Sequence, residues 1–531
     1  MSAALAGRAV TRLAARQIQR GGLIVVAVTA GMSALVAATY ASTMGTEADA
    51  AALAALAGNP AIRTLFGEPV ALDTPGGFTV WRTGTVLAVL LSVWGLLAVT
   101  RTTRGEEEAG RWSLLLAGRL GVRAVLGRHL LVLAGVMGAV GVAVTGALVA
   151  AGTPAAGAVR HGAGLALAGL FAVALAALAA QVFPTRAGAT GATVAVLGVG
   201  LLARMVGDGV AALAWLRWLS PFGLLALTRP YLDDRSLPLV VLAAGAVVVG
   251  AAAIVLAGRR DVGGGLVAGT AGRPPRRLLL GSVPRFALRR LLRPLAGWAA
   301  GVGAYFLLIG VLATSMTRFL ADNPRFAELA AQAGFAGLSS VRGYAATLFA
   351  LLAVPVGTFA AVRLGAFAAA EADRRLTLLY ALPVTRRRLL GAEALTVVAG
   401  SVVLLAVAAV ATWAGAASVG ADLPLAAALA GTLNVLPVVL LCAGAAVLAL
   451  GWVPRAVAGV GALPAAGGFL LQVVADSVGA PAWVAHLSPF AHLAAVPATG
   501  VNWPAALTMI VLALVAAALG VAGHQRRDLI G

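Results

Sequence analysis

Residues 162–182 read GAGLALAGLFAVALAALAAQV, an apolar run without a single charged residue. A helix needs roughly 20 such residues, at about 1.5 Å each, to cross the hydrocarbon layer of a membrane. Runs of this kind recur along the whole chain. They predict twelve spans, at residues 22–42, 83–100, 130–152, 162–182, 187–207, 237–257, 295–316, 343–362, 394–417, 424–450, 457–477 and 503–523.

The composition of the whole chain agrees with this interpretation. Of its 531 residues, 61% are hydrophobic and only 11% are charged, too few for the surface of a water-soluble protein. The apolar runs are continuous and do not alternate, which excludes barrel strands and leaves helices as the spanning element. We therefore predict an all-α membrane protein with about twelve transmembrane helices.

The formal net charge of +20 suggests a nucleic-acid partner at first sight, but the positions of the arginines exclude it. With the N-terminus inside, 29 arginines fall in cytoplasmic segments, nine fall in external segments, and Arg204 lies near the outer end of the fifth span. This is the asymmetry of the positive-inside rule. The sequence thus predicts a multi-pass membrane protein with both termini in the cytoplasm, facing anionic lipid headgroups.

The basic residues have one further property: all 39 are arginine, and the chain contains no lysine. A phosphate-binding P-loop requires a lysine that reaches the phosphates of the nucleotide. We therefore predict no ATPase site, no catalytic residue and no cofactor on this chain.

The chain also repeats itself. The segment EAGRWSLLL at 108–116 returns 263 residues later as EADRRLTLL at 371–379. Two further pairs follow in the same order: LSPF at 219–222 and 487–490, and RRD at 259–261 and 526–528. Several motifs in one order at a nearly constant offset indicate a duplication.

Each copy holds six predicted spans, an even number, so both copies begin and end in the cytoplasm and form a parallel repeat. We predict a first half at residues 1–258, a cytoplasmic linker at 259–283 and a second half at 284–531. The region between the halves is rich in glycine, proline and arginine, which is typical of a flexible connection.

Each half begins with a basic arm. Arg8, Arg12 and Arg16 recur every four residues, as do Arg285, Arg289 and Arg293. This spacing places the cations on one helical stripe beside apolar residues. It predicts amphipathic interfacial helices that lie along the inner leaflet before the chain turns into the bilayer, although the same charges could simply fix the topology of the first spans.

The loops after the second and eighth spans are long, helix-compatible and predicted to be cytoplasmic. The first has three acidic residues, Glu106–Glu108, followed by the leucines Leu114–Leu116. A short helix with acidic residues in its first turn is favoured by its macrodipole, and the leucines would form an apolar face for a partner or for the membrane surface.

In the second loop, a glutamate, an Asp-Arg pair, a leucine pair, then LPVTR and a leucine-glycine pair follow one another between residues 371 and 391. This order resembles the coupling helix of type 2 ATP-binding-cassette (ABC) export permeases, which joins the second and third helices of each six-helix unit. The duplicated layout is similar to that of fused permeases of actinobacterial antibiotic or polyketide exporters.

The resemblance implies a protein of the bacterial plasma membrane and a separate ABC ATPase subunit, two copies per chain, that docks on both loops and carries the ATP and the Mg²⁺. Export of a small hydrophobic or amphipathic compound would follow. The polar docking contacts would be Glu108, Arg111, Glu371 and Arg374, and the apolar ones Leu115, Leu116, Leu378 and Leu379. The alternative is that these charges only flank membrane helices.

Other residues offer little chemistry. The five histidines show no metal-binding spacing, which predicts no metal site. Arg204 and Asp476 lie near predicted external span ends, where solvent or snorkelling is a sufficient explanation. No carboxylate falls clearly in mid-membrane, which counts against a secondary, ion-coupled transporter without excluding that alternative.

Overall fold

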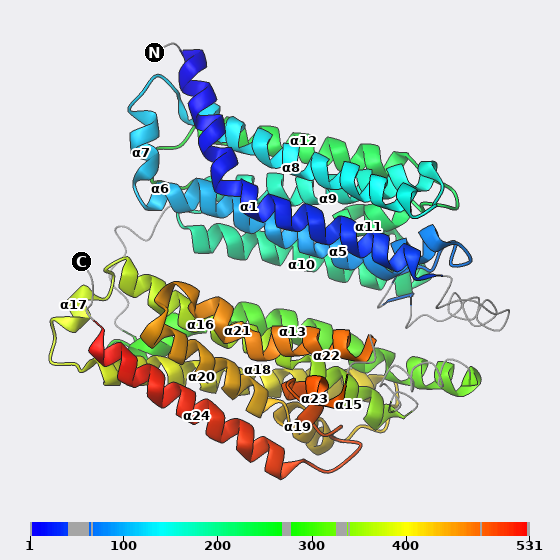
Figure 1. Cartoon of the computed structure of the whole chain (residues 1–531), viewed down its shortest axis with the longest axis vertical. Coiled ribbons are helices and arrows are strands. Elements are labelled where there is room, and N and C mark those ends of the chain that lie inside the picture. The colour runs from blue at the N-terminus through cyan, green and yellow to red at the C-terminus, as the bar shows by residue number, and fades with distance from the viewer. Residues whose placement is uncertain are drawn as a thin grey trace. The chain divides into compact units, whose positions relative to one another are not determined.

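The computed structural model describes residues 3–40, 63–64, 67–267, 278–324, 337, 340–477 and 481–527, and every regular element in these residues is a helix (Figure 1). Twelve of the helices are long and apolar enough to cross a membrane, and each overlaps one predicted span. This confirms the predicted fold class. The chain forms two compact units, residues 1–274 and 275–531, of six such helices each.

The helices of the first unit are α1 (Ala3–Ala38), α5 (Pro75–Thr100), η1 (Arg101–Gly105), α6 (Glu106–Glu108), α7 (Arg111–Leu116), α8 (Val122–Ala150), α9 (Ala155–Val182), α10 (Arg186–Gly209), η2 (Ala211–Leu219), α11 (Pro221–Leu227) and α12 (Leu237–Ala257). The second and fourth long helices are the most buried of the six. They form the centre of the unit, and large apolar side chains of the outer helices, such as Val142 and Leu131, are exposed as lipid-facing residues would be.

The helices of the second unit are α13 (Val283–Asp322), α15 (Val341–Leu351), α16 (Ala353–Ala372), α17 (Thr377–Tyr380), α18 (Arg386–Ser418), α19 (Leu425–Leu433), α20 (Leu436–Trp452), η4 (Pro454–Ala456), α21 (Val457–Ala462), η5 (Leu463–Gly467), α22 (Gly468–Ser477), α23 (Ala482–Ala485), η6 (Pro489–His492) and α24 (Trp503–Arg526). Here too the second and fourth spans are the most buried. The two units therefore share their internal arrangement as well as their motifs.

Glycine pairs allow the closest helix contacts. A Cβ atom on Gly162 of α9 would lie 2.5 Å from the carbonyl oxygen of Gly141 on α8. In the second unit, a Cβ atom on Gly415 of α18 would lie 2.2 Å from the carbonyl oxygen of Leu307 on α13. Only glycine fits at these crossings, which let backbones approach closely, as small residues do in membrane proteins generally.

The basic arms are continuous with the first span of each unit: Arg8–Arg16 belong to α1 and Arg285–Arg293 belong to α13, and Figure 1 shows α1 changing direction along its length. The start of the predicted flexible linker is also fixed in place, because the backbone N–H groups of Leu266 and Val267 donate to the carbonyls of Gln181 and Val182. The basic Pro274–Arg277 stretch of the linker lies outside the described residues.

Candidate docking elements and their ion-pair networks

The first docking element is the helix α7 and the turn that precedes it. The second span continues without interruption through η1 and α6 to Glu108. The chain then reverses at Gly110, whose φ of +72° suits glycine, and α7 starts at Arg111. The prediction that acidic residues occupy the first turn of a short helix is therefore wrong, because Glu106–Glu108 end the second span instead.

Three carboxylates at the C-terminus of a helix oppose its macrodipole, so each requires a compensating partner. Glu106 accepts two hydrogen bonds from Arg111, at 2.5 and 2.7 Å. Glu108 accepts one from the backbone N–H of Arg186, at 2.6 Å, and thereby caps the N-terminus of α10. Glu107 is held by a buried network.

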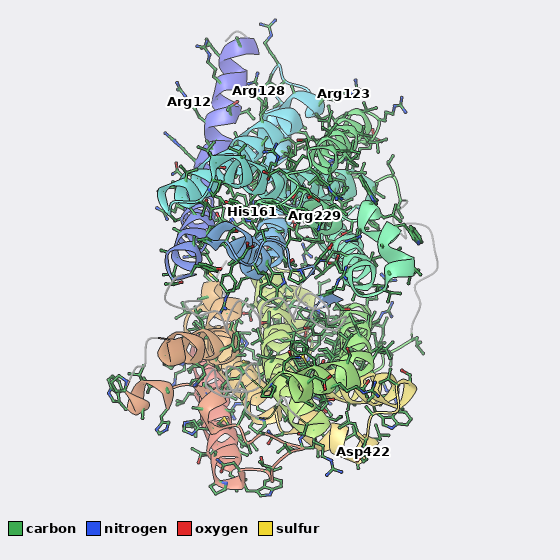
Figure 2. All side chains as sticks on the ribbon, turned by 90° about the vertical axis from the view of Figure 1, so that its right-hand side faces the viewer. Arg12, Arg123, Arg128, His161, Arg229 and Asp422 are labelled. Carbon is green, nitrogen blue, oxygen red and sulfur yellow. The ribbon has the colours of Figure 1, made fainter. Side chains whose placement is uncertain are left out.

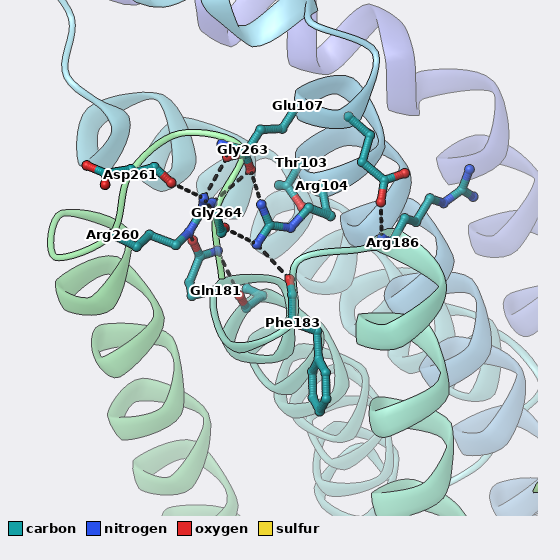
Figure 3. A network of polar contacts seen from close by, with 12 residues as sticks. Thr103, Arg104, Glu107, Gln181, Phe183, Arg186, Arg260, Asp261, Gly263 and Gly264 are labelled. Carbon is teal, nitrogen blue, oxygen red and sulfur yellow. Dashed lines mark hydrogen bonds and ion pairs between the residues drawn. The ribbon is translucent and has the colours of Figure 1, made fainter. Parts of the chain in front are cut away.

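Figure 3 shows this network around Glu107. Its two carboxylate oxygens accept hydrogen bonds from Arg260 at 2.6 and 2.8 Å, and Arg104 lies 3.0 Å away. The three side chains are only 1–4% exposed. Arg104 also donates to the carbonyls of Phe183 and Gly264, at 2.6 and 2.7 Å. The ion pair of Glu107 and Arg260 is called the first tie below.

The second unit contains a matching pair, Glu371 with Arg527, called the second tie. Glu371 is the last residue but one of α16 and is 7% exposed, and Arg527 follows α24 and is 21% exposed. The hydroxyl of Tyr380 on the docking helix α17 donates to Glu371 at 2.7 Å, and Nε2 of His524 lies 3.5 Å from the same carboxylate. Burial and the hydrogen bond to Glu371 raise the pKa of Tyr380, so this hydroxyl remains a donor at neutral pH.

These positions correct the alignment of the two copies. The sequence letters pair Glu108 with Glu371 at an offset of 263, but the structure matches the elements at an offset of 264. Four pairs of positions match at that offset. They are the residues with positive φ (Gly110 and Arg374), the buried residues (Trp112 and Leu376), the exposed leucines (Leu114 and Leu378) and the first residues of α8 and α18 (Val122 and Arg386). Glu107, not Glu108, is therefore the counterpart of Glu371.

The predicted docking residues divide into exposed and internal ones. Arg111, Arg374 and Leu378 are exposed, whereas Leu115, Leu116 and Leu379 are only half-exposed. Glu371 is part of the second tie and has little surface to offer. Leu114 belongs to the predicted apolar face but not to the predicted docking contacts; it is 78% exposed and matches Leu378 at 83%, so each element presents one prominent leucine.

The arms present part of their predicted arginines to the surface. Arg8, Arg12, Arg16, Arg285 and Arg293 are exposed, and Arg289 is half-exposed and donates to the carbonyl of Leu278 at 2.9 Å. Figure 2 shows Arg12, Arg123 and Arg128 on the same side of the first unit. The sequence did not single out Arg290, which forms an ion pair at 3.4 Å with the buried Glu393.

At the opposite end of the first unit, Arg204 does not reach solvent as expected. It is 3% exposed and forms an ion pair at 2.6 Å with Asp208, which Arg217 approaches to 3.6 Å. The side chain of Asp476 lies outside the described ones. Within the part of the chain that the structure describes, no three metal-ligating side chains gather at one point.

Two six-helix units of lipid-facing helices, each with a short polar element after its second span, define a duplicated membrane permease. Comparison with known families agrees. The family model for the C-terminal domain of the multidrug efflux system permease Rv1217c matches the chain twice, at residues 9–256 and 280–525. The chain belongs to this family of multidrug efflux permeases.

A named relative is similar along nearly the whole chain. The multidrug efflux system permease protein Rv1217c of Mycobacterium tuberculosis (strain ATCC 25618 / H37Rv) is 31% identical over 496 residues, which cover 91% of this chain and 87% of the relative. The expected duplicated export permease is thus confirmed, and neither comparison favours an ion-coupled carrier.

Proposed function

We propose that this chain is the membrane subunit of an ABC-type exporter, which moves hydrophobic or amphipathic drug-like compounds outward. A separate ATPase subunit supplies the energy, and two copies of it dock on α7 and α17. These copies bind the ATP and the Mg²⁺. The subunit lies in the plasma membrane with both termini and both docking elements in the cytoplasm, as the distribution of arginines favours.

One observation carries this proposal: the same exposed element occurs twice. Leu114 and Leu378 are among the most exposed large apolar residues described, yet they lie outside the candidate spans. Arg111 and Arg375 flank them, are 58% and 66% exposed, and form ion pairs with Glu106 and Asp373. An apolar anchor beside charged side chains of both signs fits a protein pocket with a polar rim, and hot spots of interfaces combine such contacts.

The direct experiment measures dye uptake into inside-out vesicles that contain this chain, with and without its ATPase subunit. We expect uptake only when both the ATPase subunit and ATP are present. Uptake driven by a proton gradient alone would overturn the proposal.

The docking surface has its own test. Leu114→Asp combined with Leu378→Asp should reduce binding of the purified ATPase by at least about ten-fold, as the loss of two hot-spot residues does. Leu278→Asp is the matched control, because Leu278 is 78% exposed, lies outside the candidate spans and belongs to neither element. Unchanged binding by the double variant, or equal loss in the control, would reject these docking sites.

A further inference from the structure

The two ties connect the same set of elements in each unit. In the first, Glu107 ends the second span, Arg260 follows the sixth span, and Arg260 donates to Gln181 at the end of the fourth span at 2.8 Å. In the second, Glu371 ends the second span and Arg527 follows the sixth. Arg527 donates to the carbonyl of Leu450 in the fourth span at 2.8 Å. Both ties therefore join the predicted cytoplasmic ends of spans two, four and six.

The surroundings of the two ties differ while the pair itself is the same. The first tie is completed by Arg104 and by the backbone N–H of Gly263, at 2.7 Å. The second is completed by Tyr380 and His524 instead. The glutamate and the arginine are thus the shared part of the two networks.

Stability alone gives no reason to build such a pair twice. Removing two charges from water is costly, and well-packed apolar residues in place of a buried ion pair are often equally stable or more stable. A buried pair does have one mechanical property: its partners cannot separate without leaving an uncompensated charge in a dry site. Helix ends that share such a pair are held together when one of them is displaced.

The docking elements are placed to cause such a displacement. Each tie glutamate lies one short turn before the left-handed residue, Gly110 or Arg374, that begins a docking element. We propose that Glu107 and Glu371 are positioning residues, which transmit the movement of α7 and α17 through Arg260 and Arg527 to the sixth span of each half. This inference rests on the proposed ATP-driven function.

The test removes the second tie without leaving a buried charge. Glu371→Met combined with Arg527→Met is compared with Arg290→Met combined with Glu393→Met. The control pair is similarly buried, with Arg290 20% and Glu393 4% exposed, but it joins α13 to α18, the first and third spans of the second unit. Each full-length variant is reconstituted with its ATPase, and dye transport and ATP hydrolysis are measured in the same vesicles.

We expect the tie variant to bind the ATPase and hydrolyse ATP within about two-fold of the unmodified chain, but to move about ten-fold less dye per ATP, as mutations in coupling networks do. The control should keep its ratio of dye to ATP. An unchanged ratio in the tie variant, or an equal fall in both variants, would overturn the inference. A failure of the proposed function is distinct, since it would appear in the unmodified chain as uptake that needs no ATP.

A second variant tests the mechanical claim without relying on an apolar replacement. Cys442 is the only cysteine of the chain and is buried, so Glu371→Cys with Arg527→Cys introduces two addressable thiols. This variant should be uncoupled, and a short bis-maleimide cross-link between the two thiols should restore the ratio of dye to ATP. A cross-linked protein that stays uncoupled would contradict a mechanical role for the tie.

Discussion

The two docking elements are held in place by different means. The first element is fixed by packing: Trp112 is 1% exposed and lies in a cluster with Val10, Val125, Leu126 and Ala257. The second element is held by a hydrogen bond, which the hydroxyl of Tyr380 on α17 donates to the carboxylate of Glu371 in the second tie. A duplicated part can therefore keep its shape, its buried apolar position (Trp112 or Leu376) and its exposed leucine while other supporting interactions change.

The largest difference should appear when a tie loses only its carboxylate. Glu107→Leu leaves Arg104 and Arg260 uncompensated, both almost fully buried, and should lower the free energy of unfolding by about 3–5 kcal/mol. Glu371→Leu should cost less, because Arg527 is 21% exposed and water can solvate it. Thermal unfolding of both variants in detergent measures this, and an equal loss would show that the two sites are equally dry.

The next effect concerns packing. Trp112→Ala should destabilise the first unit by about 3–4 kcal/mol, because a large buried side chain leaves a cavity among its neighbours. The matched change Leu376→Ala removes a smaller side chain, 3% exposed, and should cost about 2–3 kcal/mol. If the leucine variant proves the more damaging in thermal unfolding, packing does not dominate at the first element.

A smaller effect is expected for the polar support of the second element. Tyr380→Phe removes one hydrogen bond to a carboxylate and should cost about 1–2 kcal/mol, since α17 is partly solvated. The raised pKa of Tyr380 means that this contribution is complete below the ordinary tyrosine pKa of about 10 and is lost only as the pH rises through the higher folded value.

The difference in stability between the unmodified chain and Tyr380→Phe should thus stay constant from about pH 6 to pH 9. A difference that disappears within this range would show that the hydroxyl does not donate to Glu371.

The smallest effect on stability belongs to the two prominent leucines. Leu114→Asp and Leu378→Asp should each change the free energy of unfolding by less than about 0.5 kcal/mol, because both side chains are already in solvent. The two variants should also weaken binding of the ATPase to a similar extent, and a loss confined to one variant would show that the elements are unequal in docking.

Much of the fold follows from the sequence. The spans are visible because lipid demands long apolar runs, and the repeat is visible because its motifs stand out against alanine and leucine. The ties were not predictable in the same way. Glu107 is one of three consecutive glutamates, and only the course of the helix through η1 and α6 decides which of them faces Arg260.

The alignment error at the docking elements has a related cause. Identical letters at an offset of 263 paired Glu108 with Glu371, whereas backbone conformation pairs Gly110 with Arg374. Arginine is an unusual residue at positive φ, so nothing in the sequence indicates a matching turn at Arg374. Arg204 differs from its predicted solvent-exposed position because Asp208, one helical turn later, pairs with it in the interior.

Because Arg260, Gly263 and Gly264 belong to the network around Glu107, the segment after the sixth span is part of the first half in a functional sense. The position of a cut therefore matters if the halves are produced as two separate polypeptides. A division after residue 274 leaves this network whole, whereas a division after residue 258, the boundary expected from hydropathy, assigns its arginine to the other polypeptide. Half-transporters intended to reassemble should therefore be separated at the later position.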